Sequence, residues 1–101
     1  MPLRITVIAD PLTCLAFGLA GIETRPVHGA AEAAAALAAV QQGGGTGLVL
    51  ITERVADTIR EQVDRLVLET TIPLLLEIPD RDGPVPGRKS TRERMVTLMG
   101  S

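Results

Sequence analysis

Side chains that could carry out chemistry follow two apolar runs of this sequence. Asp10 comes directly after the run 5–9, and Thr52 and Glu53 end a second run. Runs that are apolar on both faces are typical of strands covered on both sides in a parallel sheet. Ligands of such sheets bind beyond the carboxyl ends of the strands. Any site should therefore form at Asp10, Thr52, Glu53 and the loop that follows Ile78.

Phosphotransfer to an aspartate is the first reaction that these positions could support. Receiver domains of bacterial signalling carry paired acids after the first strand, a phosphorylatable aspartate after the third and a lysine after the last. In this chain Asp10 stands alone and Thr52 and Glu53 end the third strand. Pro79 and Asp80 take the place of the lysine. We therefore do not expect phosphotransfer of this kind.

The single cysteine and the single histidine are the remaining candidates. A helix N-terminus lowers the pKa of a thiol and makes it a nucleophile, but Cys14 falls inside a predicted helix, where a free cysteine commonly serves as a small hydrophobe. His28 has no second type of metal ligand clustered near it in the sequence. The glycine-rich run 43–47 precedes a strand and contains no lysine, unlike a phosphate-binding P-loop. We expect neither a metal nor a cofactor.

The composition indicates one domain with an aliphatic core. The chain has 101 residues, 46% of them hydrophobic, with one phenylalanine and no tryptophan or tyrosine. Ten basic and twelve acidic residues give a net charge of −2, so no global positive field would attract nucleic acid. One cysteine allows no intramolecular disulfide, and no apolar run approaches the ~18 residues of a membrane span. We expect a cytosolic chain without direct membrane insertion.

The elements that position these residues alternate between strands and helices. We expect strands at 5–9, 23–27, 48–52 and 72–78, a first helix that starts at Asp10 and Pro11, and helices at 30–42, 53–69 and 91–99. This order is typical of an open parallel sheet with right-handed crossovers. It predicts an α/β fold with a four-stranded, flavodoxin-like (Rossmann-like) sheet in the strand order 2-1-3-4.

The chain divides into three segments of a single domain. Residues 1–79 form the sheet domain, residues 80–89 a linker loop rich in proline and glycine, and residues 90–101 a C-terminal helix. Within the sheet domain, the first helix has apolar residues on two sides and should be short and buried, with Gly21 as a left-handed C-cap. Its apolar residues are Leu12, Leu15, Phe17 and Leu19.

The predicted C-terminal helix is the best candidate for contact with a partner. Ser90 and Glu93 have the spacing of a capping box, which starts a helix. Cations cluster near that start, where the helix dipole disfavours them, so an acidic partner would relieve the conflict. The alternative is a helix that packs on its own sheet with solvated charges. The candidates for partner contact are Arg88, Arg92, Met95, Leu98 and Met99.

Four stretches together resemble the F subunit of V-type ATPases, the A/V-type enzymes of archaea and bacteria. They are ITVIAD at 5–10, AFGLAGIE at 16–23, GLVLITE at 47–53 and LEIP at 76–79, followed by a final helix that ends in glycine. The resemblance covers essentially the whole chain. Family members commonly carry an arginine where this chain has Gly18, so a contact made by that arginine is not carried over.

The resemblance implies a mechanical function without catalytic residues. Members of this family look like a four-stranded parallel domain with a C-terminal helix, bound to the coiled coil of the D subunit on the central rotor shaft, inside or below the ring of A and B subunits. Such a protein helps the shaft couple ATP turnover to ion translocation and can tune ATPase activity. The alternative is a small phosphotransfer or ligand-binding module that uses Asp10, Cys14 and Glu53.

Overall fold

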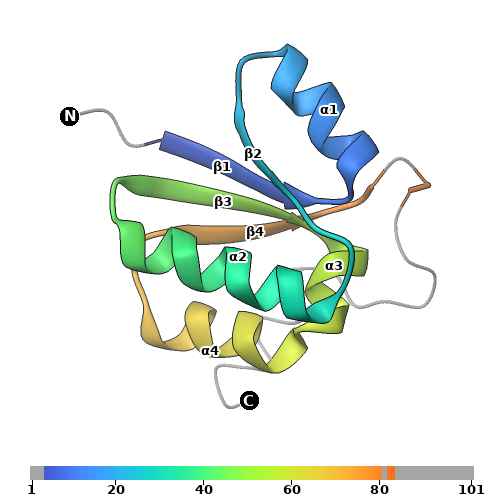
Figure 1. Ribbon diagram of the computed structural model, residues 1–101. Helices are drawn as coiled ribbons and strands as arrows, with labels where there is room; N and C mark the ends of the chain where they lie inside the picture. Colours follow the sequence, from blue (N-terminus) through green and yellow to red (C-terminus); the bar gives the residue numbers. More distant parts are fainter. Residues whose placement is uncertain (1–3, 81, 84–101) are drawn as a thin grey trace.

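The computed structural model describes residues 4–80 and 82–83 and contains one parallel sheet (Figure 1). Its strands pair in the order β2-β1-β3-β4, which confirms the predicted topology. The strands are β1 Arg4–Ala9, β2 Glu23–Pro26, β3 Thr46–Thr52 and β4 Leu74–Ile78. The helices are α1 Pro11–Leu19, α2 Ala30–Gly43, α3 Glu53–Thr58 and α4 Arg60–Glu69. Most of the predicted linker loop 80–89 and all of the predicted C-terminal helix 90–101 lie outside the described residues.

The helices form two unequal layers on the sheet. Figure 1 shows α1 on one face, and α2, α3 and α4 on the other. The parallel register aligns Val7 with Leu50 and Leu50 with Leu76, so these three side chains share the face that α1 covers. This follows from the crossovers, since β1 connects to β2 through α1, whereas the later crossovers return over the opposite face.

The larger core lies under α2, α3 and α4. It is built on Ile8, Val49 and Ile51, which point from the two central strands and have no exposed side-chain surface. Alanines on the inner side of α2, including Ala33 and Ala36, allow that helix to lie close to the sheet. The predicted aliphatic core is therefore concentrated on one side of the sheet.

The core on the α1 face is smaller. Val7, Ala9 and Cys14 are buried there, with Phe17 and Ile22 packed partly buried against them. Gly21 ends α1 with a φ of 85°, the left-handed conformation expected of a C-cap. Phe17 and Ile22 therefore hold this helix on the sheet. The prediction that both sides of α1 are buried is wrong, because its outer leucines are exposed.

The predicted helix at 53–69 is in fact two helices separated at Ile59. The hydroxyl of Thr58 donates to the carbonyl of Val55 at 2.6 Å. That carbonyl is the one an α-helix would use for the amide of Ile59, which donates instead to Ala56 at 3.1 Å. Apolar spacing continues through the break, and Ile59 remains only 3% exposed. Periodicity therefore could not reveal it.

Candidate functional site

Asp10 lies at the carboxyl end of β1, where a catalytic carboxylate would be expected, but it caps α1. One of its carboxylate oxygens accepts from the amide of Thr13 at 3.1 Å. The other accepts from the hydroxyl of the same residue. The extended backbone of Asp10, with φ −62° and ψ 159°, is that of an N-cap. The carboxylate of Asp10 thus accepts a hydrogen bond from a backbone amide in the first turn of α1, which would otherwise have no partner within the helix.

Cys14 is buried one turn into α1. Its side chain is 3% exposed, and the thiol donates to the carbonyl of Ala9 across 3.5 Å. Burial raises the pKa of this thiol, because desolvation disfavours the thiolate. A buried thiol with a raised pKa is a poor nucleophile. The structure therefore gives no support to a phosphotransfer reaction at Cys14.

A shallow pocket at the strand ends brings Asp10, His28 and Arg54 together. Arg54 Nε is 2.9 Å from a carboxylate oxygen of Asp80, so the arginine is paired within the chain. His28 Nδ1 lies 3.3 Å from Glu32 Oε1, on α2. Among residues 4–80 and 82–83, no three histidine, cysteine or acidic side chains are grouped so that they could hold a metal. The described residues that line the pocket include neither paired acids nor an activated nucleophile.

Thr52 and Glu53 do not extend this pocket into a catalytic site. Thr52 is 1% exposed and precedes α3, whose first residue is Glu53. Glu53 lies in the first turn of α3, where its negative charge interacts favourably with the positive end of the helix dipole. Asp10, Thr52 and Glu53 therefore all lie at helix starts, and the side chain of Asp10 caps its helix.

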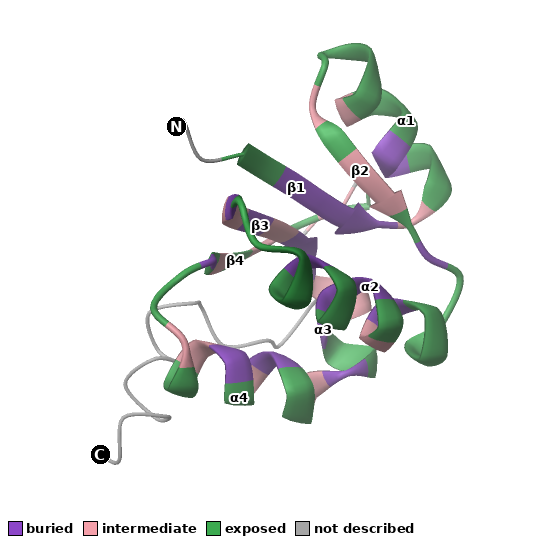
Figure 2. Cartoon of the chain, turned by 60° about the vertical axis from the view of Figure 1, so that its left-hand side comes forward, coloured by how far each residue is buried: buried purple, intermediate pink, exposed green. Residues whose placement is uncertain are grey.

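The outer surface of α1 has the more unusual composition. Leu12, Leu15 and Leu19, which we call the α1 leucine row, are 54%, 59% and 83% exposed. Figure 2 shows α1 mostly in green, the colour of exposed residues. The row lines a groove of about 400 Å³ together with other residues that include Phe17 and Pro79. Contiguous exposed apolar surface of this kind marks interaction sites.

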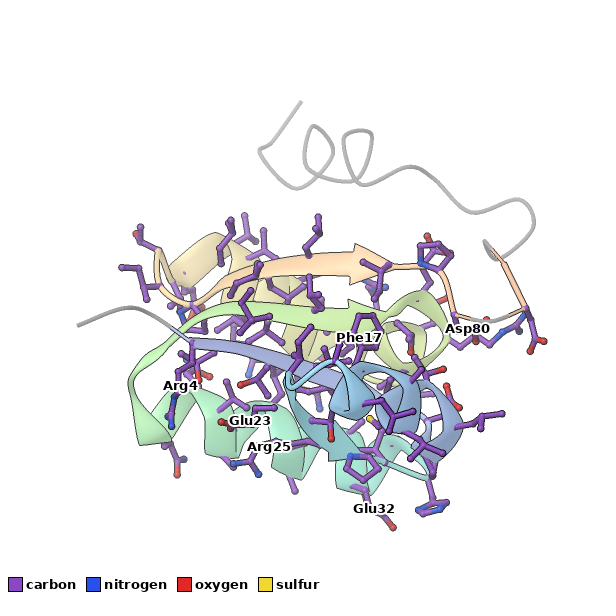
Figure 3. The ribbon with its side chains drawn as sticks, turned by 90° about the horizontal axis from the view of Figure 1, so that it is seen from above. Arg4, Phe17, Glu23, Arg25, Glu32 and Asp80 are labelled. Carbon is purple, nitrogen blue, oxygen red and sulfur yellow. The ribbon has the colours of Figure 1, made fainter. Side chains whose placement is uncertain are left out.

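The same face of the sheet is also apolar beyond α1. Leu74 and Leu76 of β4 are 64% and 41% exposed. The register places them on the α1 face, beside β3. Figure 3 looks down on this face, with Phe17 over the strands and Asp80 beyond the end of β4. The exposed apolar surface thus extends from α1 across to the sheet edge.

The sequence analysis did not identify the α1 leucine row as a surface. Residues 11–22 contain no charged side chain, a pattern that fits a buried helix as well as an apolar surface left to a partner. The candidates chosen from the sequence, Arg88, Arg92, Met95, Leu98 and Met99, lie outside the described residues.

No helix within the described ranges is long and apolar enough to span a membrane.

Comparisons with known proteins agree on one family. A family model described as ATP synthase (F/14-kDa) subunit matches residues 5–96. The F subunit of the A-type ATP synthase of Methanococcus maripaludis is 30% identical over 84 residues, which cover 82% of this chain and 80% of the relative. The F subunit of the V-type ATP synthase of Thermus thermophilus is 36% identical over 74 residues, covering 73% of this chain and 71% of the relative.

A solved structure shares the fold. The crystal structure of the V-type ATP synthase F subunit of Archaeoglobus fulgidus superposes with a TM-score of 0.63. The match covers 77% of this chain and 99% of that chain, at 20% sequence identity. The arrangement of four strands with helices on both faces is therefore one that this solved structure also has.

Proposed function

Because the chain belongs to the family of ATP synthase (F/14-kDa) subunits, we propose that it is a non-catalytic component of the central stalk of a V-type ATPase or ATP synthase. It binds the coiled coil of the D subunit and helps the rotor shaft couple ATP turnover to ion translocation. Contact with the A and B ring subunits is transient. We place it in the cytoplasmic, soluble V1/A1 sector, peripheral to the membrane.

One observation from the structure carries this proposal: the side chains best placed for chemistry serve the fold, while apolar side chains face outwards. Asp10 caps a helix and Cys14 is buried with a raised pKa. In contrast, three leucines of one nine-residue helix are more than half exposed. A protein that transmits force needs contact surfaces rather than an activated nucleophile. The phosphotransfer alternative has no comparable support.

The C-terminal segment is the second region that we assign to partner contact. Met95, Leu98 and Met99 fall on one side of the predicted helix, and Arg88 and Arg92 lie near its start. Methionine adapts to irregular surfaces, and a helix of about nine residues is marginal in isolation. Docking on an adjacent helix would stabilise it. Through this contact the segment tunes ATPase activity.

Co-expression with the D subunit tests the central-stalk proposal. The two proteins should elute as one complex in size-exclusion chromatography at micromolar concentration. Elution as two separate proteins would remove the main support for the proposal. A stable phosphoryl adduct in the intact mass of the chain would instead favour a phosphotransfer module.

A double variant in the C-terminal segment tests the second contact. Met95→Asp with Leu98→Asp places two charges on the predicted apolar side, so we expect weaker assembly or altered ATPase activity of the complex, with the sheet domain still folded. Thr97→Asp is the matched control, because residue 97 projects from the other side of the same predicted helix. Equal behaviour of the double variant, the control and the wild type would reject these contact residues.

A further inference from the structure

The α1 leucine row has the geometry of a helix-packing surface. Leu12, Leu15 and Leu19 are spaced by three and four residues, so they form a single stripe along the helix. The spacing is that of the seam between the helices of a coiled coil. No charged side chain interrupts this stripe anywhere in α1. A helix exposed to water on this side would normally carry charges there.

Gly18 provides a second, independent observation on the same surface. It is exposed and lies in the last turn of α1, next to two leucines of the row. A Cβ atom built at Gly18 would meet nothing within 4 Å, so packing within the chain does not require a glycine. Glycine inside a helix disfavours folding relative to alanine. A missing side chain on an exposed helix surface allows the backbone of a second helix to approach closely.

The charges around the groove restrict what can bind there. Asp80, at one end of the groove, is 7% exposed through its side chain and is paired with Arg54 at 2.9 Å. The groove therefore presents an apolar and electrically neutral surface. Its occupant should match it with an uncharged stripe. The row carries no cations of the kind that attach an amphipathic helix to anionic lipid.

The chain's own C-terminal segment is a poorer match for this groove. It begins close to the groove, since Gly83 pairs with Asp80. Four cations, Arg88, Lys89, Arg92 and Arg94, then follow within seven residues. Among the described residues that line the groove, the one acid is Asp80, which is already paired.

Contact with α1 alone is too small an interface for a stable complex. A helix of nine residues is about 13 Å long. Contact along one such helix falls short of the roughly 800 Å² that each partner buries in a stable complex. The row is therefore suited to be one part of a larger interface that has a further contact elsewhere.

We propose that the α1 leucine row and the groove beside it dock an apolar stripe of a partner helix, with Gly18 at the point of closest approach. The partner is the coiled coil of the central stalk, so this inference rests on the proposed function and specifies the surface that it uses. The shaft helix would lie along α1 and contribute uncharged side chains to the groove.

Binding of the purified D subunit to the full chain tests this surface. The variant Leu15→Gln with Leu19→Gln should weaken binding by at least about tenfold, because two anchors lose their apolar contact. Leu68→Gln is the matched control. Leu68 is 55% exposed on α4, close to the 59% of Leu15, and lies outside the α1 leucine row. The control should bind within about twofold of the wild type, and thermal melting checks that every variant is folded.

A photo-crosslinking amino acid at position 15 gives a readout that does not depend on affinity. It should link to the D subunit in the assembled complex, whereas the same group at position 68 should not. Suppose that the wild type binds the D subunit, but that the glutamine variant binds equally well and position 15 gives no crosslink to the D subunit. The assignment of this surface would then be wrong, while the central-stalk proposal would stand. Crosslinks in the complex to the chain's own C-terminal segment, to a second copy or to lipid would also overturn it. If the wild type does not bind the coiled coil, both proposals fail.

Discussion

Asp10 and Cys14 lie one helical turn apart at the start of α1. Hydrogen bonding engages the carboxylate of Asp10 and burial encloses the thiol of Cys14, so neither group is available to react with a substrate. The two oxygens of Asp10 are engaged by Thr13, and the thiol of Cys14 is turned into the small core on the α1 face. At the residue scale, the distinction between a catalytic group and a structural one is therefore set by burial and hydrogen bonding. Residue type and spacing alone do not decide it.

Cys14 should be unreactive and should make stability depend on alkaline pH. Its pKa is raised by burial above the ordinary value of 9.0, so the unfolded chain releases this proton first as the pH rises. The resulting contribution to stability is complete below about pH 9 and is lost as the pH increases further. Urea unfolding of the wild type and Cys14→Ala should therefore show a difference in unfolding free energy that shrinks above pH 9.

Alkylation provides the control for this interpretation. At neutral pH, iodoacetamide should modify folded Cys14 at least roughly tenfold more slowly than the urea-unfolded chain, because the folded thiol is buried and protonated. Rapid modification of the native protein, or a pH dependence identical in Cys14→Ala, would show that the thiol is accessible.

At the scale of elements, the strand order followed from the sequence, while the helix break at Ile59 and the exposure of α1 did not. The runs 5–9 and 48–52 are apolar on both faces, which identifies the two central strands of a parallel sheet. The break occurs where the Thr58 hydroxyl donates to the carbonyl of Val55. The spacing of apolar residues along the sequence does not reveal such a hydrogen bond. The apolar residues of α1 indicated a helix correctly, but pattern alone cannot tell a surface covered by its own chain from one left to a partner.

Arg60 connects the broken helix to the sheet edge, and its loss should be costly. It binds both oxygens of Glu77 on β4, at 2.7 and 2.9 Å, and also reaches Asp57 and Asp64. Burial alone would lower the pKa of Arg60, but the hydrogen bonds that its guanidinium donates to these carboxylates raise it. Glu77 is 7% exposed through its side chain. Arg60→Gln would leave that charge without its bidentate partner, so we expect a loss of about 2–3 kcal/mol in unfolding free energy.

An exposed ion pair supplies the comparison for Arg60. Arg65 lies 3.4 Å from Glu61 with both side chains more than half exposed, and Arg65→Gln should change stability by less than about 0.5 kcal/mol. Adding Glu77→Gln to Arg60→Gln should recover part of the loss, because the buried carboxylate that has lost its bidentate hydrogen bonds to Arg60 is removed. Chemical denaturation of the four proteins measures these effects, and equal losses at Arg60 and Arg65 would contradict the assigned role.

Two glycines at the end of α1 should respond in opposite directions to alanine. Gly18 is helical with open space around its missing Cβ, so Gly18→Ala should raise the unfolding free energy by about 0.5 kcal/mol. Gly21 has a φ of 85°, and Gly21→Ala should lower it by about 1 kcal/mol. Urea midpoints of the two variants provide the test. A destabilised Gly18→Ala would mean that the glycine is needed within the chain, which would weaken its assignment to a partner contact.

At the scale of the whole molecule, the apolar side chains are distributed unevenly over the sheet. The face under α2, α3 and α4 holds the main core, whereas the α1 face leaves Leu74 and Leu76 of β4 and the α1 leucine row exposed. The sequence analysis predicted a contact region in the C-terminal segment, which lies outside the described residues, and missed the α1 leucine row, since its leucines fitted a buried helix equally well. Family membership gives the imbalance a physical reason, because a component of a larger assembly can complete its burial on its neighbours.

The two proposed contact regions should contribute independently to binding of the D subunit. Interactions more than about 7–10 Å apart with no shared partner groups usually add in free energy. The fold-losses in affinity of Leu15→Gln with Leu19→Gln and of Met95→Asp with Leu98→Asp should therefore multiply when the four substitutions are combined. Titrating the D subunit into wild type, each double variant and the fourfold variant gives the cycle. A fourfold variant that binds no more weakly than the weaker double variant would show that both regions form one coupled contact, with the C-terminal segment packed against α1 rather than each reaching the shaft separately.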